Sequence, residues 1–521
     1  MMPSRSPRPP WTAMLLCCAL LLVAGRSTSG DRGTGVALGQ VETAGPEGEI
    51  DLSPPGLSPM LDGGGTGEAP IAPGSPAMGF ESAGVPAATP VTMPPAESMQ
   101  AAIDKAVAAR LARHPPFYVP ATDFAAPKGL VLHATTHRES RFPFALALNG
   151  YLQARWLNLA RGVTEWTDAT GTPQPVLNES SFNLNRIYLQ AAGYAGSERV
   201  LYDFAVFGTT NAGLLVTFVP VGFVGYAVTE DLKIGAGVTQ VPGSREWLVS
   251  SQWPIGVDRS MVNTFIRPSY SPGVFAIGSL LDKTLSYQAG VWNGIDGGVA
   301  GYLKGGTAMA WAGNMWWEPI GPFGLGYSDM EHHDSPAIRL GSSGVTARSP
   351  ATIIAAAQGF PNPENTVVRL SDGTPLAAAG VLGPGSQVDA FNYNLATVDV
   401  GWKWRGWSAF GEYSWRLLDG FTGTGAFDRS SLFDHGGSAS VGWCFLPRTH
   451  EIYGRSSALA GPFGSAQEFG GGFNWYMHGT RQNRLTFETL WIDSSPAQNP
   501  LYPYRAGFTG TAIQAQYLVI F

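Results

Sequence analysis

The sequence is poor in charge and in cysteine. Only 14% of its 521 residues are charged, and the formal net charge is −7, which argues against a nucleic-acid partner because phosphate binding needs clustered Lys and Arg. Of the three cysteines, Cys17 and Cys18 lie in the N-terminal apolar run, so Cys444 stands alone in the mature chain. An intramolecular disulfide and a cysteine-based metal site are thereby excluded, and we expect Cys444 to be a small apolar filler.

Enzyme motifs are missing as well. The chain has no Gly-x-Ser-x-Gly elbow, no His-Glu-x-x-His helix and no phosphate-cradling loop before a Lys. The tight cluster His332-His333-Asp334 lies in an expected connection, where a solvated polar loop is favoured over a metal site. We therefore predict no catalytic residue, no metal and no cofactor.

Long apolar runs are confined to the N-terminus. Arg5 and Arg8 precede the apolar stretch 13–24, and Val23-Ala24-Gly25 offers a small-residue cleavage site. This predicts a signal peptide over residues 1–25 and export of the protein. The run is too short for a membrane-spanning helix, and no stretch of 18 apolar residues occurs elsewhere.

Two further segments precede the main body of the chain. Residues 26–95 are rich in Pro, Gly and Ala without hydrophobic periodicity, which predicts a disordered linker. Residues 96–113 carry Met99, Ile103, Val107 and Leu111 at intervals of four, which predicts a short amphipathic helix. The helix could serve oligomerisation or be marginal and unpartnered, and the sequence leaves both interpretations open.

From residue 144 to residue 521 the hydrophobic period is two. In 407–416, for example, Trp407, Tyr413 and Trp415 alternate with Glu412 and Arg416. Successive strand residues face opposite sides, so one face is apolar and the other largely polar. Charged and amide side chains on the polar face would meet solvent in a sandwich and the lumen in a membrane barrel, and aromatics near strand ends favour the barrel.

The lengths of the connections distinguish these folds further. About sixteen candidate strands occur between 144 and 521, and connections such as 160–181, 241–272 and 345–390 are long. Those that alternate with them, such as 405–406 and 447–448, are very short, with 320–334 as an exception. Short turns on one rim and long loops on the other are typical of bacterial membrane barrels. We predict an all-β fold, a transmembrane antiparallel β-barrel of about 16 strands over 144–521.

Several short motifs recur in order through this region. They are Phe182-x-Leu184-x-Arg186-x-Tyr188, Leu232-Lys233-Ile234-Gly235, Pro242, Glu246-x-Leu248-x-Ser250-Ser251, Asp258-Arg259-Ser260 and the run from Leu285 to Gly294 that ends in Trp292-Asn293-Gly294. Together they resemble the phosphate-selective porin O/P family of bacterial outer-membrane porins, and the resemblance covers about three quarters of the chain.

The resemblance implies an outer-membrane channel of sixteen strands, commonly a homotrimer. In the family, loops after the fifth and ninth strands fold inward to narrow the pore, and 241–272 and 345–390 take those positions here. Phosphate-selective members line the constriction with Arg and Lys. Because 241–272 contains no Lys and also holds Glu246 and Asp258, phosphate specificity is not carried over.

Specific residues follow from the alternation and from the resemblance. Arginines on or beside the first of these loops are the constriction candidates, namely Arg186, Arg245, Arg259 and Arg267. Strand charges expected to face the lumen, where they could steer solutes or only pair along the wall, are Asp399, Lys403, Arg405, Glu412, Arg416, Glu451, Arg455 and Glu488. The terminal Phe521 resembles the signal that bacterial barrel-assembly machinery reads.

The favoured function is passive diffusion of small polar or anionic solutes through a porin in the outer-membrane lipid, not catalysis. Two alternatives stay open. An outer-membrane barrel could carry an enzyme site at its rim, which a reactive Ser or His there would support. A secreted β-sandwich could act as a binding module, which solubility without detergent would support.

Overall fold

The computed structural model describes residues 130–211, 217–295, 309–324, 326–351 and 363–521. The predicted signal peptide (1–25), linker (26–95) and amphipathic helix (96–113) lie outside these residues. Within the described residues, no helix has the length and apolar character needed to cross a membrane.

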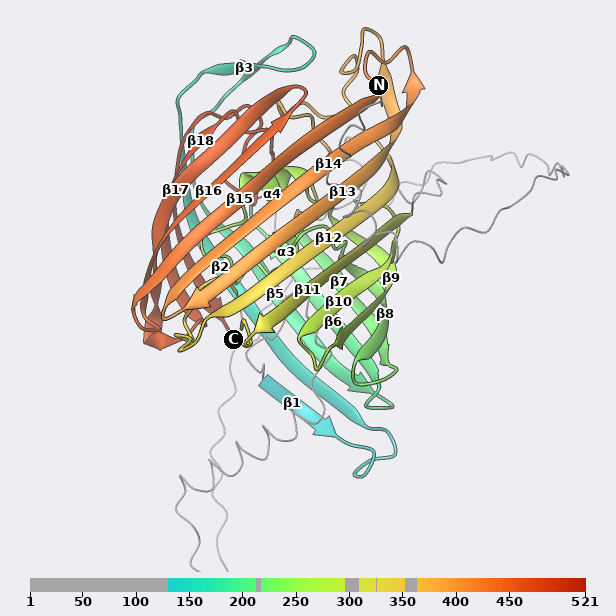
Figure 1. Cartoon of the computed structure of the whole chain (residues 1–521), viewed down its shortest axis with the longest axis vertical. Coiled ribbons are helices and arrows are strands. Elements are labelled where there is room, and N and C mark those ends of the chain that lie inside the picture. The colour runs from blue at the N-terminus through green and yellow to red at the C-terminus, as the bar shows by residue number, and fades with distance from the viewer. Residues whose placement is uncertain (1–129, 212–216, 296–308, 325, 352–362) are drawn as a thin grey trace, which may run out of the picture. The chain divides into compact units, whose positions relative to one another are not determined.

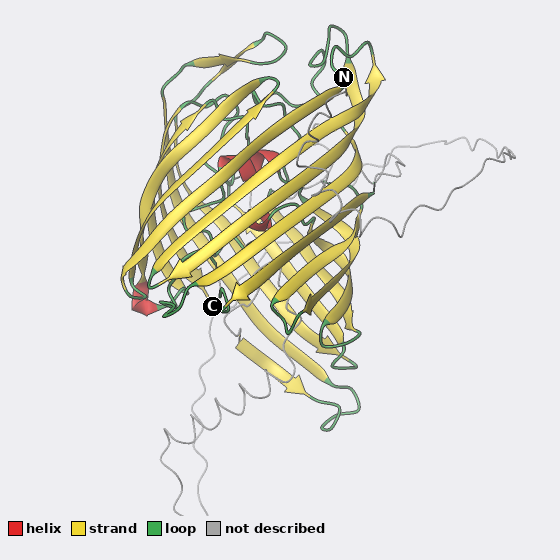
Figure 2. Ribbon diagram, in the orientation of Figure 1, coloured by secondary structure: helices red, strands yellow, loops and turns green. Residues whose placement is uncertain are grey.

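Sixteen antiparallel strands form a closed barrel (Figures 1 and 2). The ring closes where β19 pairs with β2, with Gly510 opposite Arg161 and Ile520 opposite Tyr151. The predicted strand number is confirmed, and a closed barrel excludes the β-sandwich. The strands are β2 (Phe144–Arg161), β5 (Glu179–Ala195), β6 (Val200–Thr209), β7 (Thr217–Ala227), β8 (Leu232–Gln240), β9 (Tyr270–Leu280), β10 (Leu285–Trp292), β11 (Ala310–Ile320), β12 (Ala337–Pro350), β13 (Gln387–Trp404), β14 (Trp407–Thr424), β15 (Ser431–Leu446), β16 (His450–Gly461), β17 (Gly464–Tyr476), β18 (Asn483–Asp493) and β19 (Gly510–Ile520).

In the described parts of the chain, six further elements lie outside this ring, and the sequence analysis did not predict them. The strand β1 pairs with the start of β2, beyond the end of β19. A small hairpin of two three-residue strands interrupts the connection after β2. These elements are β1 (Leu130–Thr135), β3 (Glu165–Thr167), β4 (Pro173–Pro175), α3 (Arg245–Leu248), α4 (Met261–Ile266) and η4 (Met477–Gly479).

The wall has an apolar outer face and a largely polar inner face. In β14, Trp407 and Tyr413 are exposed on the outside, whereas Glu412, Ser414 and Arg416 are buried. The last strand repeats the pattern, with Ile513, Tyr517 and Phe521 outside and Gln514 and Gln516 inside. The strands therefore place hydrophobic side chains outward and polar ones inward, as a barrel in lipid requires.

One rim of the barrel carries short turns. The β13–β14 turn consists of Arg405 and Gly406, with φ angles of 48° and 83°. Two successive positive φ angles define a type I′ turn, whose twist matches that of the flanking strands. Arg405 is therefore exposed at the rim, with its guanidinium 5.0 Å from the centre of the Trp404 ring. The prediction that Arg405 faces the lumen is wrong, because the strand ends one residue earlier, at Trp404.

Three connections from the opposite rim pack inside the wall. Residues 241–269 hold α3 and α4, which lie inside the barrel wall (Figure 2). The side chains along this segment are buried. Ser244 caps α3 by accepting from the Trp247 N–H, and Ser260 caps α4 in the same way from the Asn263 N–H. Parts of the connections 363–386 and 494–509 are also buried, and their leucines and tyrosines pack with the wall.

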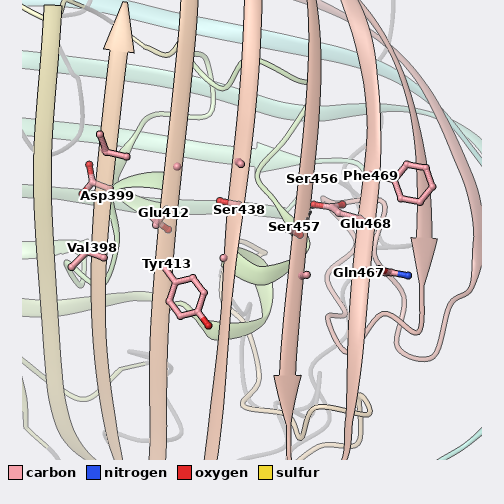
Figure 3. A pocket seen from close by; sticks show the side chains of 15 residues that line it. Val398, Asp399, Glu412, Tyr413, Ser438, Ser456, Ser457, Gln467, Glu468 and Phe469 are labelled. Carbon is pink, nitrogen blue, oxygen red and sulfur yellow. Dashed lines mark hydrogen bonds between the residues drawn. The ribbon is translucent and has the colours of Figure 1, made fainter. Parts of the chain in front are cut away.

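The outer face of β13–β17 contains a hollow of about 640 Å³ (Figure 3). Its floor consists of small residues, and the larger side chains of Val400, Tyr413 and Phe469 also line it. The small outward residues are Gly411, Gly437, Ala439, Ser456 and Ala458. The hydrophobic outer surface is therefore uneven, with a recess among bulky side chains.

Candidate functional site

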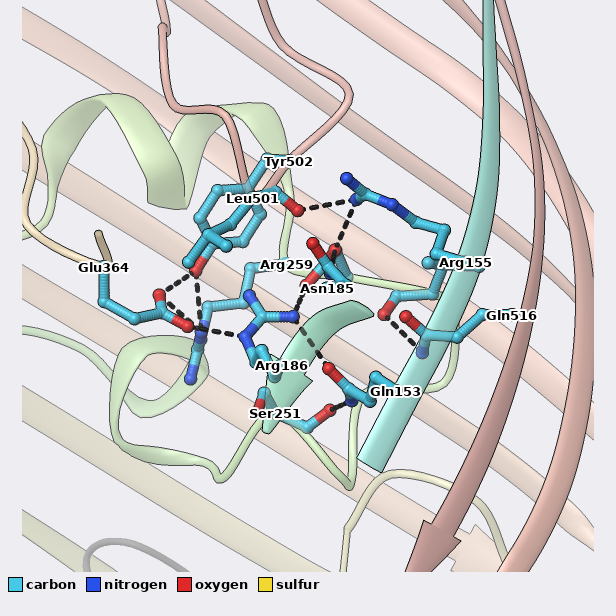
Figure 4. A network of polar contacts seen from close by, with 12 residues as sticks. Gln153, Arg155, Asn185, Arg186, Ser251, Arg259, Glu364, Leu501, Tyr502 and Gln516 are labelled. Carbon is cyan, nitrogen blue, oxygen red and sulfur yellow. Dashed lines mark hydrogen bonds and ion pairs between the residues drawn. The ribbon is translucent and has the colours of Figure 1, made fainter. Parts of the chain in front are cut away.

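A buried polar network inside the barrel joins two wall strands to all three interior connections (Figure 4). Arg155 comes from β2 and Arg186 from β5, while Asp258, Arg259 and Arg267 come from 241–269. The connections 363–386 and 494–509 contribute Glu364 and Tyr502. We refer to these seven residues as the arginine cluster. Because its members come from five separate segments, the network fixes the connections relative to the wall.

The Glu364 carboxylate lies at the centre of the arginine cluster. Its Oε1 accepts from Arg186 Nε at 2.6 Å, and its Oε2 accepts from the Tyr502 hydroxyl at 2.5 Å. Arg259 Nη1 and Arg267 Nη2 each lie 3.5 Å from Oε2. Burial alone would raise the pKa of this carboxyl, but the surrounding guanidiniums and the Tyr502 hydroxyl lower it to about 2. Glu364 is therefore ionised at any physiological pH.

Asp258 is the second carboxylate of the cluster. It accepts from Arg186 Nη1 at 2.7 Å, from Arg155 Nη1 at 3.3 Å and from Asn185 Nδ2 at 3.2 Å. Within the described part of the chain, four guanidiniums and two carboxylates meet here, so the cluster carries 4 − 2 = 2 excess positive charges. Such an excess creates a positive potential in a site shielded from water.

The arginines from 241–269 are positioned by their own segment. Arg259 donates from Nε to the Glu246 carbonyl at 2.9 Å and from Nη2 to the Val249 carbonyl at 2.8 Å. Both guanidiniums lie over the Trp247 ring, that of Arg267 at 3.7 Å and that of Arg259 at 4.9 Å from its centre. Backbone carbonyls and a cation–π contact thus hold both groups in place.

Three of the four constriction candidates are brought together, and Arg245 lies elsewhere. Arg186, Arg259 and Arg267 all contact Glu364, as described above. The Arg245 guanidinium instead lies among three aromatic rings, 5.3 Å from Phe323, 5.5 Å from Tyr327 and 5.9 Å from Phe410. Phe323 and Tyr327 belong to the connection 321–336 on the other rim, the one long connection that the sequence analysis noted there. Arg245 therefore belongs to an aromatic site at the opposite end of 241–269.

The strand charges predicted to face the lumen, Arg405 excepted, have buried side chains on the inner side of the alternation: Asp399, Lys403, Glu412, Arg416, Glu451, Arg455 and Glu488.

Several of these inner charges pair with neighbours along the wall. Arg416 Nη2 lies 2.8 Å from Asp434, and Arg455 lies 3.3 Å from Glu468 and 3.6 Å from Glu488. Arg416 and Arg455 are therefore charges that pair along the wall, one of the two roles that the sequence analysis left open for the inner charges.

In the structure His333 is grouped with two carboxylate residues other than the Asp334 that the sequence analysis considered. A group that could hold a metal ion is formed by Asp329, Glu331 and His333, whose ligand atoms lie within 4.8 Å of one another. Arg481 Nη2 is 2.7 Å from both Glu331 oxygens, and His333 Nδ1 is 2.5 Å from Asp329. Both carboxylates of this group therefore already have protein partners, Arg481 for Glu331 and His333 for Asp329.

Sequence reasoning missed Arg155, Glu364 and Tyr502 as members of the site. Arg155 faces inward by the same alternation that placed the other wall charges, so the period of two could have found it. Glu364 and Tyr502 lie in connections without periodicity, and nothing local in the sequence links them to Arg186.

Solved structures that are similar to this chain include bacterial outer-membrane proteins. An anion-selective porin from Comamonas acidovorans matches at 11% identity, with 73% of this chain and 100% of that chain covered and a TM-score of 0.46. Outer-membrane expressed OmpT of Vibrio cholerae matches at 11%, covering 75% and 100%, with a TM-score of 0.43. The outer-membrane channel DcaP of Acinetobacter baumannii matches at 9%, covering 73% and 97%, with a TM-score of 0.43.

No protein-family model and no curated protein matches the sequence. The resemblance to the phosphate-selective porin O/P family therefore stays a prediction. The fold itself rests on the strand pairing of this chain.

Proposed function

We propose that the protein is an outer-membrane porin through which small polar or anionic solutes diffuse passively. The observation that carries this proposal is the closed ring of sixteen strands with an apolar outer face and a polar inner face. In lipid every backbone polar group needs an internal partner, and a closed ring provides one because it has no edge. We assign no catalytic role to the chain.

The proposal also covers how the lumen is narrowed and which partners the protein has. The connections 241–269 and 363–386 would narrow the lumen, and the arginine cluster would form part of the constriction. Following the family resemblance, we infer a homotrimer and assembly through barrel-assembly machinery that reads Phe521. Export by a signal peptide over residues 1–25 belongs to the same proposal.

Ion selectivity tests the porin assignment directly. We expect the purified protein to conduct in planar bilayers with a modest preference for anions, because the arginine cluster has excess positive charge. The double change Arg259→Ala and Arg267→Ala should reduce this preference, measured as the reversal potential under a chloride gradient. Arg138→Ala, at an exposed site outside the barrel wall, serves as the control.

Two outcomes of that measurement are informative. The absence of any conductance in correctly folded protein would contradict the porin proposal. A strongly cation-selective wild-type channel would contradict the placement of the arginines at the constriction, while leaving the channel function intact.

Fractionation and gel mobility provide a second test, which concerns the location of the barrel in the outer membrane. The mature protein should fractionate with the outer membrane and require detergent, and it should migrate at different apparent sizes in gels with and without boiling. A closed barrel has no edge strand from which to fray, so it resists unfolding until heated. Recovery of unheated protein in the soluble periplasmic fraction would argue against a membrane location.

A further inference from the structure

Four side chains of the arginine cluster contact the Glu364 carboxylate in the way that a binding site contacts a bound carboxylate ligand. Its donors reach the two carboxylate oxygens from three separate segments: Arg186 from β5, Arg259 and Arg267 from 241–269, and Tyr502 from 494–509. Glu364 itself comes from the connection 363–386. The group that is bound and the groups that bind it therefore belong to different parts of the chain.

Contacts independent of the Glu364 carboxylate hold these donors in position. Arg186 donates from Nη1 to Asp258 at 2.7 Å and to Gln153 Oε1 at 3.0 Å. Arg259 is held by backbone carbonyls and Arg267 by the Trp247 ring, as described above. Removal of the carboxylate leaves these contacts of the three arginines in place, and Arg259 Nη1 still donates to the Tyr502 hydroxyl at 2.8 Å, so the four donors should remain positioned.

The excess positive charge of the arginine cluster favours an anion at this position. With Glu364 the cluster has an excess of two positive charges, and without it the excess becomes 4 − 1 = 3. Buried guanidiniums that lose an anionic partner are costly, so an anion from solution should bind where the Glu364 carboxylate was.

We propose that Glu364 is a tethered substitute for a solute carboxylate, and that the cradle of Arg186, Arg259, Arg267 and Tyr502 binds small carboxylate solutes when Glu364 leaves. The proposal rests on the porin function and deepens it by naming the solute class. A carboxylate is favoured because the cradle treats the two oxygens differently. Arg186 Nε donates to Oε1 at 2.6 Å, whereas the Tyr502 hydroxyl donates to Oε2 at 2.5 Å.

The connection that carries Glu364 determines how strongly this residue competes with a free solute for the donors. A group linked to its binding site by a chain segment has an effective concentration in the millimolar range for flexible linkers, and higher when it is held rigidly. Free solute must therefore exceed roughly millimolar concentration to replace Glu364 in the wild type. Removal of the carboxylate should expose the same cradle to solute at far lower concentration.

Binding to the full-length protein folded in detergent tests this proposal. We expect Glu364→Gln and Glu364→Ala to bind succinate and acetate at least tenfold more tightly than the wild type, measured by calorimetry. Asp372→Asn is the matched control, because Asp372 lies in the same connection and its carboxylate accepts from Thr374. This control should leave affinity unchanged. In the Glu364→Ala background, Tyr502→Phe should weaken binding again.

Each contrary result has a defined meaning. If the folded Glu364 variants bind succinate and acetate no better than the wild type, the cradle is not a ligand site. If inorganic phosphate binds them as tightly as succinate, the site takes oxyanions generally and the carboxylate assignment is wrong.

The wild type provides a readout that does not depend on whether the variants fold. At saturating succinate, residues 363–386 should exchange amide hydrogens faster because Glu364 has left its position. Unchanged exchange would overturn the displacement. Binding in detergent does not require transport, so binding without conductance would contradict only the porin function, and conductance without binding only this inference.

Discussion

Deletion of Phe521 is expected to reduce the amount of folded barrel in the outer membrane at least tenfold. The backbone N–H of Phe521 donates to the Gly150 carbonyl and the Gly150 N–H donates to the Phe521 carbonyl, both at 2.9 Å. The aromatic ring lies over Gly150, since a Cβ placed on that glycine would be 2.9 Å from Phe521 Cζ. The terminal residue thus completes the β19–β2 seam, and a terminal aromatic is also what we propose the assembly machinery reads.

Two comparisons separate these contributions. Phe521→Ser should lose the signal and the ring but keep the two backbone hydrogen bonds, whereas Phe521→Tyr should behave like the wild type. Phe445→Ser removes another exposed phenylalanine from the same rim and serves as the control. The amount of heat-modifiable protein in outer-membrane fractions is the measurement. Wild-type levels of the Phe521→Ser protein would show that the residue has no role in assembly.

Replacement of Arg186 by Met should destabilise the folded barrel by about 3–5 kcal/mol, the cost of breaking buried ion pairs by removing one partner. Arg186 pairs with both Asp258 and Glu364, and all three side chains are buried. The loss should appear as a lower midpoint of denaturant unfolding and a lower temperature for the gel mobility shift. Arg138→Met, at an exposed position, should change neither.

A double change sharpens that expectation. If Glu364→Gln is combined with Arg186→Met, one of the two carboxylates that lose Arg186 as a partner is removed as well, so the double change should cost less than the sum of the single changes. Additive costs would show that Arg186 and Glu364 do not interact energetically, which would contradict the network in Figure 4.

The strands were predictable because their determinant is local. A period of two is visible within ten residues, and it located all sixteen wall strands with ends shifted by a few residues. In β13, for instance, the structure begins at Gln387 and the prediction at 391. The register shifts between Val388 and Ala390, and this irregularity interrupts the period of two at the start of the strand.

The arginine cluster was predictable only in part because its determinants are distant in the chain. Arg186, Arg259 and Arg267 were selected from the family resemblance and their loop. Their partner Glu364 lies more than 90 residues away from any of them, in a segment without a repeating pattern. Arg245 was grouped with them by sequence proximity alone, although a helical turn and the intervening chain direct it toward Phe323 and Tyr327.

The β19–β2 seam described above also governs how the barrel must form. Its two strands stand at opposite ends of the barrel sequence, so no hydrogen bond of the seam can form until the last residues have been synthesised. Before then the sheet has two unpaired edges, which lipid does not tolerate. Contacts between such distant segments are slow to form and leave aggregation-prone edges exposed meanwhile. A chain of this protein therefore cannot insert progressively as a stable partial barrel, and loss of β19 should be as damaging as loss of β2.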